Sequence, residues 1–365
     1  MNIVIVFPSG FTDTHALAKA MQKLYKGIEN IDIEGNSILC EAYDAVDLAS
    51  ELSKMFGVER VAIAKKVSCN FSELSASIVE AGSRIIIPGD RFYVKVIIPR
   101  PANLSYRSRD LEFACSGILA AKLAPMDALP AKTEVDASRV ILTVVGKKSA
   151  YICVNVVRGP GGLIAGSRGT AMGSIHDCLS FISCLMTAKA GFDCTSIVLP
   201  YADDSDLGIN AKLAELFAIR TGRKKQTIYT TPVKVPAKGY PSSLLKEKII
   251  SKILIQCQNK IITFPLTTAA HPVWFIESVI QDAVFAGKVP ISPMISLSSE
   301  LGYYAKEVGI DLRISAPNIA EGNLLRYSNA IESEARSAIK HMKKLELKVG
   351  PNYLHDIMDS VERFS

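Results

Sequence analysis

A glycine-rich segment near the middle of the chain limits how the chain can fold. Five glycines occur within the eleven residues from Gly159 to Gly169, with Arg158 before them and Arg168 among them. Glycine adopts left-handed backbone conformations at little steric cost, so this run predicts a sharp change of chain direction. A chain of 365 residues that is 48% hydrophobic can build two or three cores. The sequence therefore predicts a multidomain protein with a boundary at this segment.

Two sets of mixed elements precede the glycines. Before residue 58, the patterns of apolar and turn residues predict strands at 2–8 and 37–41 and helices at 14–25 and 45–56. From residue 58 on, they predict strands at 61–67 and 91–98 and helices at 71–81 and 107–123. Two β-branched runs, 140–145 and 151–157, flank Gly146-Lys147-Lys148-Ser149 and predict a hairpin with a basic tip in solvent.

Helices and strands alternate after the glycines, from about residue 170 to residue 365. Strands are expected at 195–200, 226–230, 261–264 and 289–295, and helices at 179–189, 210–220, 244–256, 274–286, 299–308 and 329–344. This alternation predicts a doubly wound parallel sheet. Ligands of such sheets bind beyond the carboxyl ends of the strands.

The composition excludes several classes of protein. A charged fraction of 21% without long Ser, Gln or Pro tracts argues against disorder, and no apolar run is long enough to span a bilayer. The first eight residues lack a basic region and predict a buried strand instead of a signal peptide. Eight scattered cysteines without a C-x-x-C pair predict reduced thiols in a cytoplasmic protein, with no disulfide framework and no metal site.

Positive charge is concentrated in one segment of the chain. The net charge is +6, but residues 59–169 contain 16 lysines and arginines against nine acidic residues, a balance of +7. A basic stretch is more often a solvated face than a binding site. Its concentration in one region of an otherwise near-neutral chain favours a polyanionic partner.

Short motifs occur in a fixed order over roughly 160 residues. They are Met55-Phe56-Gly57-Val58, Phe92-Tyr93-Val94-Lys95-Val96, Ser105-Tyr106-Arg107-Ser108, Val135-Asp136 and Gly159-Pro160-Gly161-Gly162-Leu163. Together they resemble the N-terminal ferredoxin-like and THUMP domains of the tRNA 4-thiouridine sulfurtransferases, also called thiamine-biosynthesis ThiI proteins. Pro290-Ile291-Ser292-Pro293-Met294-Ile295 and the helix ending Ala305-Lys306-Glu307-Val308-Gly309 extend the resemblance towards the C-terminus.

The resemblance implies an α/β and α+β multidomain protein with three parts. An N-terminal ferredoxin-like domain would occupy residues 1–57 and a THUMP RNA-binding domain residues 58–165. A doubly wound PP-loop ATP pyrophosphatase-like domain would occupy residues 170–365. The resemblance further implies a homodimer and, for an active enzyme, a sulfur carrier protein as a partner; no membrane partner is expected.

The resemblance also implies tRNA as the partner of the basic segment. The candidate RNA-binding residues are Lys95, Arg100, Arg107, Arg109, Lys147, Lys148, Arg158 and Arg168. The glycine-rich segment itself has two interpretations of equal weight. It binds phosphate through its backbone N–H groups, or it is only a hinge.

Adenylation in this family depends on a loop in which glycines let backbone N–H groups wrap a phosphate. The family sequence is S-G-G-x-D-S, and the matching place here is Gly173-Ser174-Ile175-His176-Asp177-Cys178-Leu179-Ser180. If Asp177 is aligned with the Asp of the motif, both glycines and both serines of the motif have no counterpart in this chain. The alternative alignment counts back from Lys189-Ala190-Gly191, which resembles the end of the family's following helix, and it matches only Ser180 to the motif. The nucleotide-binding candidates of this degenerate loop are Gly173, Ser174, Asp177 and Ser180. ATP and Mg²⁺ would be cofactors if the domain is active.

Sulfur transfer in the family requires a cysteine that carries a persulfide. The resemblance places it in the loop after the helix that ends here at Gly309. Residues 314–322 contain no cysteine, and none follows Cys257. No residue is therefore assigned a catalytic role.

Four other groups have both a functional and a plain structural interpretation. His176-Asp177-Cys178 could be nucleophilic, but an incidental loop is favoured. Asp203, Asp204 and Asp206 could bind a metal or ribose, but a solvated acidic loop is favoured. A pocket wall and a boundary turn explain His271 and Trp274 equally well. Charge complementarity at a helix end and RNA binding both explain the basic patch Arg220, Arg223, Lys224 and Lys225.

Three hypotheses of function follow. The preferred one is a tRNA-binding protein whose third domain has lost or altered adenylation and sulfur transfer. The alternative is an active ATP-dependent enzyme that converts tRNA uridine to 4-thiouridine with an external sulfur donor. A nucleotide sensor that binds no RNA is the third, and it predicts that ATP raises the thermal stability while tRNA does not.

Overall fold

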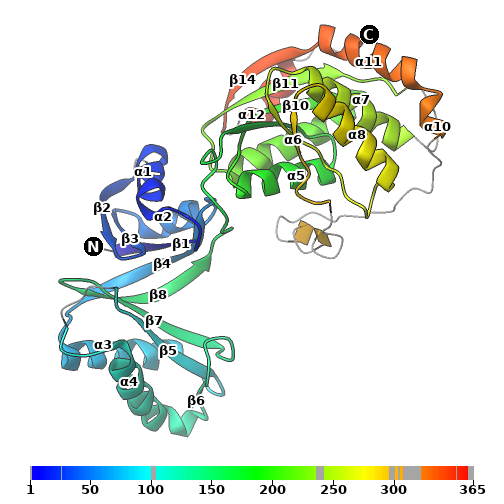
Figure 1. Ribbon diagram of the computed structural model, residues 1–365. Coiled ribbons are helices and arrows are strands. Elements are labelled where there is room, and N and C mark those ends of the chain that lie inside the picture. The colour runs from blue at the N-terminus through cyan, green and yellow to red at the C-terminus, as the bar shows by residue number, and fades with distance from the viewer. Residues whose placement is uncertain are drawn as a thin grey trace. The chain divides into compact units, whose positions relative to one another are not determined.

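The computed structural model describes residues 2–25, 27–99, 104–235, 242–295, 301–302, 305–306, 322–350 and 352–360. The chain forms two compact units, Met1–Gly162 and Leu163–Ser365 (Figure 1). The division falls inside the glycine-rich segment. No helix among the described residues is long and apolar enough to cross a membrane.

The first unit contains one eight-stranded sheet with the order β2-β3-β1-β4-β8-β7-β5-β6. The strands are β1 (Asn2–Pro8), β2 (Ile28–Glu34), β3 (Ser37–Ala42), β4 (Val58–Val67), β5 (Arg91–Ile97), β6 (Leu129–Pro130), β7 (Arg139–Val145) and β8 (Ala150–Arg158). Neighbours are antiparallel, except that β5 runs parallel to β6 and β7. Because β1 pairs with β4, the residues before and after residue 57 share this sheet.

Four helices pack on this sheet, and side-chain caps fix where three of them begin. They are α1 (Thr14–Leu24), α2 (Ala45–Leu52), α3 (Phe71–Ile85) and α4 (Ser108–Leu123), all predicted from apolar periodicity. Asp13, Asp44 and Asn70 accept hydrogen bonds from backbone N–H groups in the first turns of α1, α2 and α3, as N-cap residues do. Helices α3 and α4 bury Phe92, Ile141 and other apolar side chains of β5, β7 and β8.

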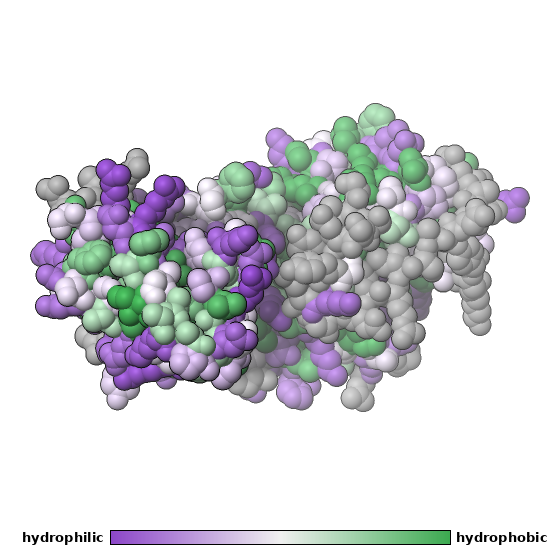
Figure 2. Space-filling view, turned by 90° about the horizontal axis from the view of Figure 1, so that it is seen from below, coloured by the Kyte–Doolittle hydropathy of each residue, from purple (hydrophilic) through white to green (hydrophobic). Residues whose placement is uncertain are grey.

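Helix α4 also carries large apolar side chains on its exposed side. Phe113 is 85% exposed and Ile118 is 50% exposed. Figure 2 shows an apolar area bordered by hydrophilic side chains on the first unit. A continuous apolar area of this kind differs from the single apolar residues that are scattered over an ordinary protein surface.

The second unit contains a six-stranded sheet with the order β13-β12-β9-β10-β11-β14. Its strands are β9 (Thr170–Ser174), β10 (Asp193–Tyr201), β11 (Lys225–Pro232), β12 (Ile261–Thr263), β13 (Val289–Ile291) and β14 (Lys343–Lys348). All pairs are parallel except β11 with β14. The predicted doubly wound parallel sheet is therefore confirmed.

Helices cover both faces of this sheet. They are α5 (Cys178–Lys189), α6 (Asp204–Arg220), α7 (Ser242–Gln256), α8 (Val273–Phe285), α10 (Gly322–Leu325), α11 (Ser328–Lys340) and α12 (Tyr353–Ser360). Helices α7, α8 and α11 bury Met172, Val198 and Ile262 of the strands in one core. Helix α5 packs on the opposite face, where Cys184 adjoins Gly173.

Several elements differ from their predictions, and one predicted helix lies mostly outside the described residues. Strands β6 and β9 and helices α10 and α12 were not predicted. The helix predicted at 329–344 is wrong at its end, because α11 stops at Lys340 and Lys343 already begins β14. Strand β2 was not predicted; its apolar residues alternate with acidic ones at the sheet edge. Most of the helix predicted at 299–308 and of the loop 314–322 lies outside the described residues.

The strand order defines where a ligand is expected in the second unit. From β9 the chain continues to β10 and β11 on one side and later to β12 and β13 on the other side. The order therefore reverses between β9 and β12, and ligands of open parallel sheets bind beyond the carboxyl ends of the strands at this point. Ile175, His176 and Asp177 directly follow β9 there.

Candidate functional site

Several connecting segments of the first unit meet at one edge of its sheet. Strands β5 and β7 end together because they are parallel, with Ile97 opposite Val144. Strand β4 ends beside the start of β8, where Lys66 is opposite Tyr151. The Tyr106 hydroxyl donates to the Cys69 carbonyl at 2.5 Å, and the Cys69 thiol contacts the Gly146 carbonyl at 3.8 Å. These contacts join the start of α4, the end of β4 and the β7–β8 hairpin.

This edge gathers six exposed basic side chains, which we call the basic edge. They are Lys65, Lys66, Arg107, Arg109, Lys147 and Lys148. In the part of the chain that the structure describes, none of the six forms an ion pair. Exposed cations that are not held in ion pairs are available to contact phosphates.

The hairpin tip is anchored to β2 by an acidic residue. A Glu34 carboxylate oxygen accepts a hydrogen bond from the Lys147 backbone N–H at 3.2 Å. A cavity of about 250 Å³ lies behind the tip, lined by Lys66, Lys147 and Lys148 together with Asp32, Glu34 and Glu41 among others. The tip is thus held in place through its backbone while its two ammonium groups remain exposed.

The other predicted RNA-binding residues lie elsewhere. Lys95 is half-buried and ion-paired with Glu134, which also pairs with Arg60. Desolvation raises the pKa of Glu134, but the charges of Lys95 and Arg60 outweigh it and lower this pKa overall. Arg158 is exposed at the far end of β8, and Arg168 is exposed in the second unit. Arg100 lies outside the described residues.

Lys65 and Lys66 contributed to the charge count but were not predicted as site residues. The signal for them was two consecutive lysines at the end of a strand. Their value as candidates depends on the pairing of β4 with β8, which places them beside the hairpin tip.

In the second unit, Gly173 lies within β9 and not in the loop that follows. A Cβ atom there would be 2.6 Å from Thr263 Cγ2 and 2.7 Å from Cys184 Sγ. Close packing between the sheet and α5 explains why this position is glycine.

We expect Gly173→Ala to lower the free energy of unfolding by about 1–3 kcal/mol through overpacking. Urea unfolding would measure the change. Gly208→Ala is the matched control, because Gly208 lies in α6 with no atom near the added Cβ, and alanine there should stabilise by about 0.5–1 kcal/mol. An equal effect of both substitutions would contradict the packing explanation.

Asp177 and Ser180 form a capping box at the start of α5. Asp177 Oδ1 accepts from the Ser180 N–H at 2.7 Å, and Ser180 Oγ accepts from the N–H groups of His176 and Asp177 at 3.0 Å each. A carboxylate therefore stands at the helix N-terminus, where an anionic ligand would otherwise be favoured. The backbone N–H groups of Ile175, His176, Asp177 and Ser180 are thus already hydrogen-bonded within the protein.

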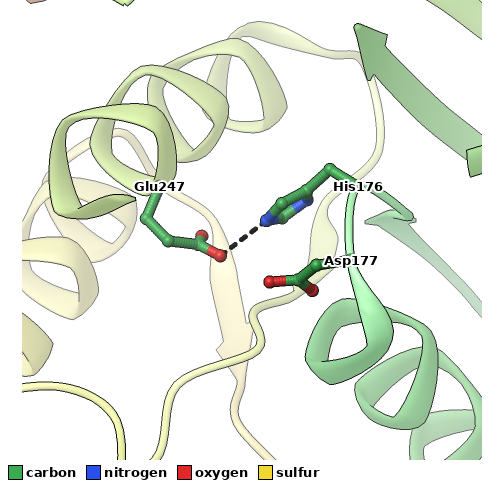
Figure 3. A group of neighbouring side chains, drawn as sticks. All are labelled: His176, Asp177 and Glu247. Atoms are coloured by element: carbon green, nitrogen blue, oxygen red, sulfur yellow. Dashed lines mark hydrogen bonds and ion pairs between the residues drawn. The ribbon is translucent and has the colours of Figure 1, made fainter. Parts of the chain in front are cut away.

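His176 is buried and lies between two oxygen-bearing residues. Its Nε2 is 2.7 Å from Glu247 Oε1 of α7, and its Nδ1 is 3.2 Å from the Ser174 hydroxyl (Figure 3). Burial acts to lower the pKa of His176, but the Glu247 and Asp177 charges outweigh it and raise this pKa overall. Desolvation acts to raise the pKa of Asp177, but the His176 charge and the Ser180 N–H outweigh it.

Cys178 is not part of this contact. Burial and then the Asp177 charge raise the pKa of its thiol, which disfavours a nucleophilic thiolate at neutral pH.

Several of the remaining candidates have structural roles, and Trp274 lines a cavity of about 210 Å³ together with Lys248 and Asp282. Asp203 caps α6 by accepting from the Asp206 N–H at 2.9 Å, and Asp206 pairs with Lys246 at 3.1 Å. The segment favoured as an acidic loop is thus a helix start. His271 is buried and stacks on Phe275, which Trp274 contacts edge-on. Arg223 is largely buried and pairs with Asp193 at 2.6 Å.

The sequence matches no family model and none of the curated proteins. Solved structures do match it. A 4-thiouridine synthetase in complex with RNA and ATP is 14% identical and covers 95% of this chain and all of its own, with a TM-score of 0.65. PH1313 from Pyrococcus horikoshii is 18% identical and covers 85% of this chain and all of its own, with a TM-score of 0.61.

The chain shares the fold of these two proteins. At these identities the likeness concerns the fold alone, and it extends through both units.

Proposed function

We propose that this chain is a tRNA-binding protein that contacts RNA phosphates through the basic edge of its first unit. The observation that carries the proposal is the meeting of six exposed, unpaired basic side chains at one edge. A-form RNA is recognised mainly through phosphates and 2′-hydroxyls, and this edge supplies the required cations. The similar synthetase was solved with RNA, which supports RNA as the polyanion.

The proposal assigns a ferredoxin-like domain to residues 1–57 and a THUMP domain to residues 58–165. Residues 170–365 are a PP-loop-like domain with lost or altered adenylation. The capping box of Asp177 and Ser180 supports this last assignment, since it occupies the helix N-terminus and the loop N–H groups. A homodimer, a sulfur carrier and a cytoplasmic location remain predictions.

Fluorescence anisotropy with labelled tRNA tests the binding. We expect saturable binding of the full chain at about 50 mM salt, with duplex DNA of equal length bound more weakly because its groove geometry differs from that of A-form RNA. Equal affinity for both nucleic acids would reduce the proposal to non-specific polyanion binding.

An ATP–pyrophosphate exchange assay separates the proposal from its alternative. The chain should show no exchange above background, with or without tRNA, because the N–H groups of His176, Asp177 and Ser180 after β9 are already bonded within the protein and are not available to pyrophosphate. Robust tRNA-dependent exchange would instead support an active uridine-thiolating enzyme that uses ATP, Mg²⁺ and an external sulfur donor.

A further inference from the structure

We propose that His176, Asp177 and Glu247 bind a divalent first-row transition-metal ion. This site goes beyond RNA binding and does not depend on it. It lies at the carboxyl end of β9, where the strand order of the second sheet reverses.

The geometry brings three metal-binding groups together from two parts of the chain, because His176 and Asp177 are adjacent and Glu247 is 71 residues away from His176. His176 Nε2, one Asp177 carboxylate oxygen and one Glu247 carboxylate oxygen all lie within 4.8 Å of one another. Figure 3 shows the three side chains converging from the end of β9, the start of α5 and the helix α7. Zinc-like ions lie about 2.0–2.2 Å from such nitrogen and oxygen atoms. Small side-chain movements therefore suffice to place an ion among them.

The orientations of His176 and Asp177 are each supported by a further contact. The Ser174 hydroxyl is 3.2 Å from His176 Nδ1, so Nε2 is the ring nitrogen that faces the carboxylates. Metal-binding histidines are commonly held in this way through their other nitrogen. Asp177 Oδ1 caps α5, and its second oxygen is left for an ion.

The charge of the cluster also favours a dication. Asp177 and Glu247 contribute two carboxylates to the cluster. Lys246 pairs with Asp206 at 3.1 Å, and its charge also acts on His176 and Asp177. A divalent ion among the three side chains would lie against both carboxylates and offset their charges.

The donor set indicates the class of metal. Imidazole nitrogen suits Zn²⁺, Co²⁺, Fe²⁺ and similar ions, whereas Mg²⁺ and Ca²⁺ prefer all-oxygen sites. The His176 and Glu247 side chains are 3% and 12% exposed, but Asp177 is exposed and gives the ion a route from solvent. Three protein ligands leave at least one coordination position for water or an anion.

Cobalt binding to the full chain tests the site. After dialysis against a chelator, titration with Co²⁺ should give visible absorption that saturates at one ion per chain and is displaced by Zn²⁺. Glu247→Gln keeps a hydrogen-bonding partner for His176, and Asp177→Asn keeps a capping residue, so both variants should fold. Each substitution should weaken Co²⁺ binding by at least about tenfold. Loss of a residue that only supports a metal ligand already lowers metal affinity by about tenfold or more, and loss of the ligand itself should lower it further.

Asp203→Asn is the matched control, because Asp203 caps α6 as Asp177 caps α5 but has no histidine beside it. Its Co²⁺ affinity should equal that of the unaltered chain. Absence of saturable Co²⁺ binding, or equal binding by Glu247→Gln, would overturn the proposal and leave a protonated His176 paired with carboxylates. The same variants should also be titrated with labelled tRNA, whose binding should be unchanged. Failure of the metal site is then distinguishable from failure of RNA binding.

Discussion

Replacing Arg107, Arg109, Lys147 and Lys148 by glutamate should weaken tRNA binding by on the order of 100-fold or more at low salt. The four side chains belong to α4 and to the β7–β8 hairpin, yet they lie at one edge of the sheet. Each reversal removes a phosphate contact and adds a repulsive charge. Fluorescence anisotropy with labelled tRNA measures the loss, and circular dichroism checks that the variant is folded.

The matched control carries the same change in net charge at the opposite end of the same unit. Arg84, Arg91, Lys122 and Lys132 are exposed and lie outside the basic edge, and their reversal should change the affinity by less than about tenfold. If both quadruple variants lose affinity equally, overall charge governs binding and the basic edge is not the site.

Asp282→Ala should lower the free energy of unfolding by about 3 kcal/mol. Lys248 of α7 is only 9% exposed, and its ammonium is 2.9 Å from Asp282 and 2.6 Å from the Ser278 hydroxyl. Burial lowers the pKa of Lys248, so removal of the carboxylate leaves a costly cation inside the protein. Urea unfolding at neutral pH measures the loss.

The stabilisation should also depend on pH in a defined direction. Desolvation raises the pKa of Asp282, but the Lys248 and Lys252 ammonium groups outweigh it and lower this pKa overall. The contribution is therefore present above the ordinary pKa of aspartate and is lost as the pH falls through the lowered value.

Lys248→Met with Asp282→Leu should recover most of the stability, because apolar pairs replace buried ion pairs well. A loss below about 1 kcal/mol in Asp282→Ala would show that the pair is effectively solvated.

Strong periodic patterns made most helices and several strands predictable from the sequence. The strands that were missed carry weak local signals. Strand β9 has the sequence Thr-Ala-Met-Gly-Ser directly after the glycine-rich segment, so its glycine looks like a continuation of the loop. Strand β14 follows α11 after two residues, and its Lys-Lys-Leu-Glu-Leu-Lys sequence continues a helix-like mixture of charged and apolar residues. Pairing with β11, and not local preference, makes it a strand.

The candidate sites depend more than the helices and strands do on contacts between residues that are far apart in the sequence. His176, Asp177 and Ser180 were identified as neighbours along the chain, but Glu247 is 71 residues from His176 and was not predicted. The packing of α7 against β9 brings it next to the residues that follow this strand. In the first unit the basic residues were predicted as one set. The strand register separates Arg158 from the hairpin tip and adds Lys65 and Lys66.

The salt dependence of tRNA binding by the unaltered chain tests the central claim most directly. If four to six side chains of the basic edge contact phosphates, the logarithm of the association constant should fall linearly with the logarithm of salt concentration, with a slope of about −3 to −5. The quadruple edge variant should show a much shallower slope. Binding that does not respond to salt, or no binding at about 50 mM salt, would contradict the assignment of this chain as a tRNA-binding protein.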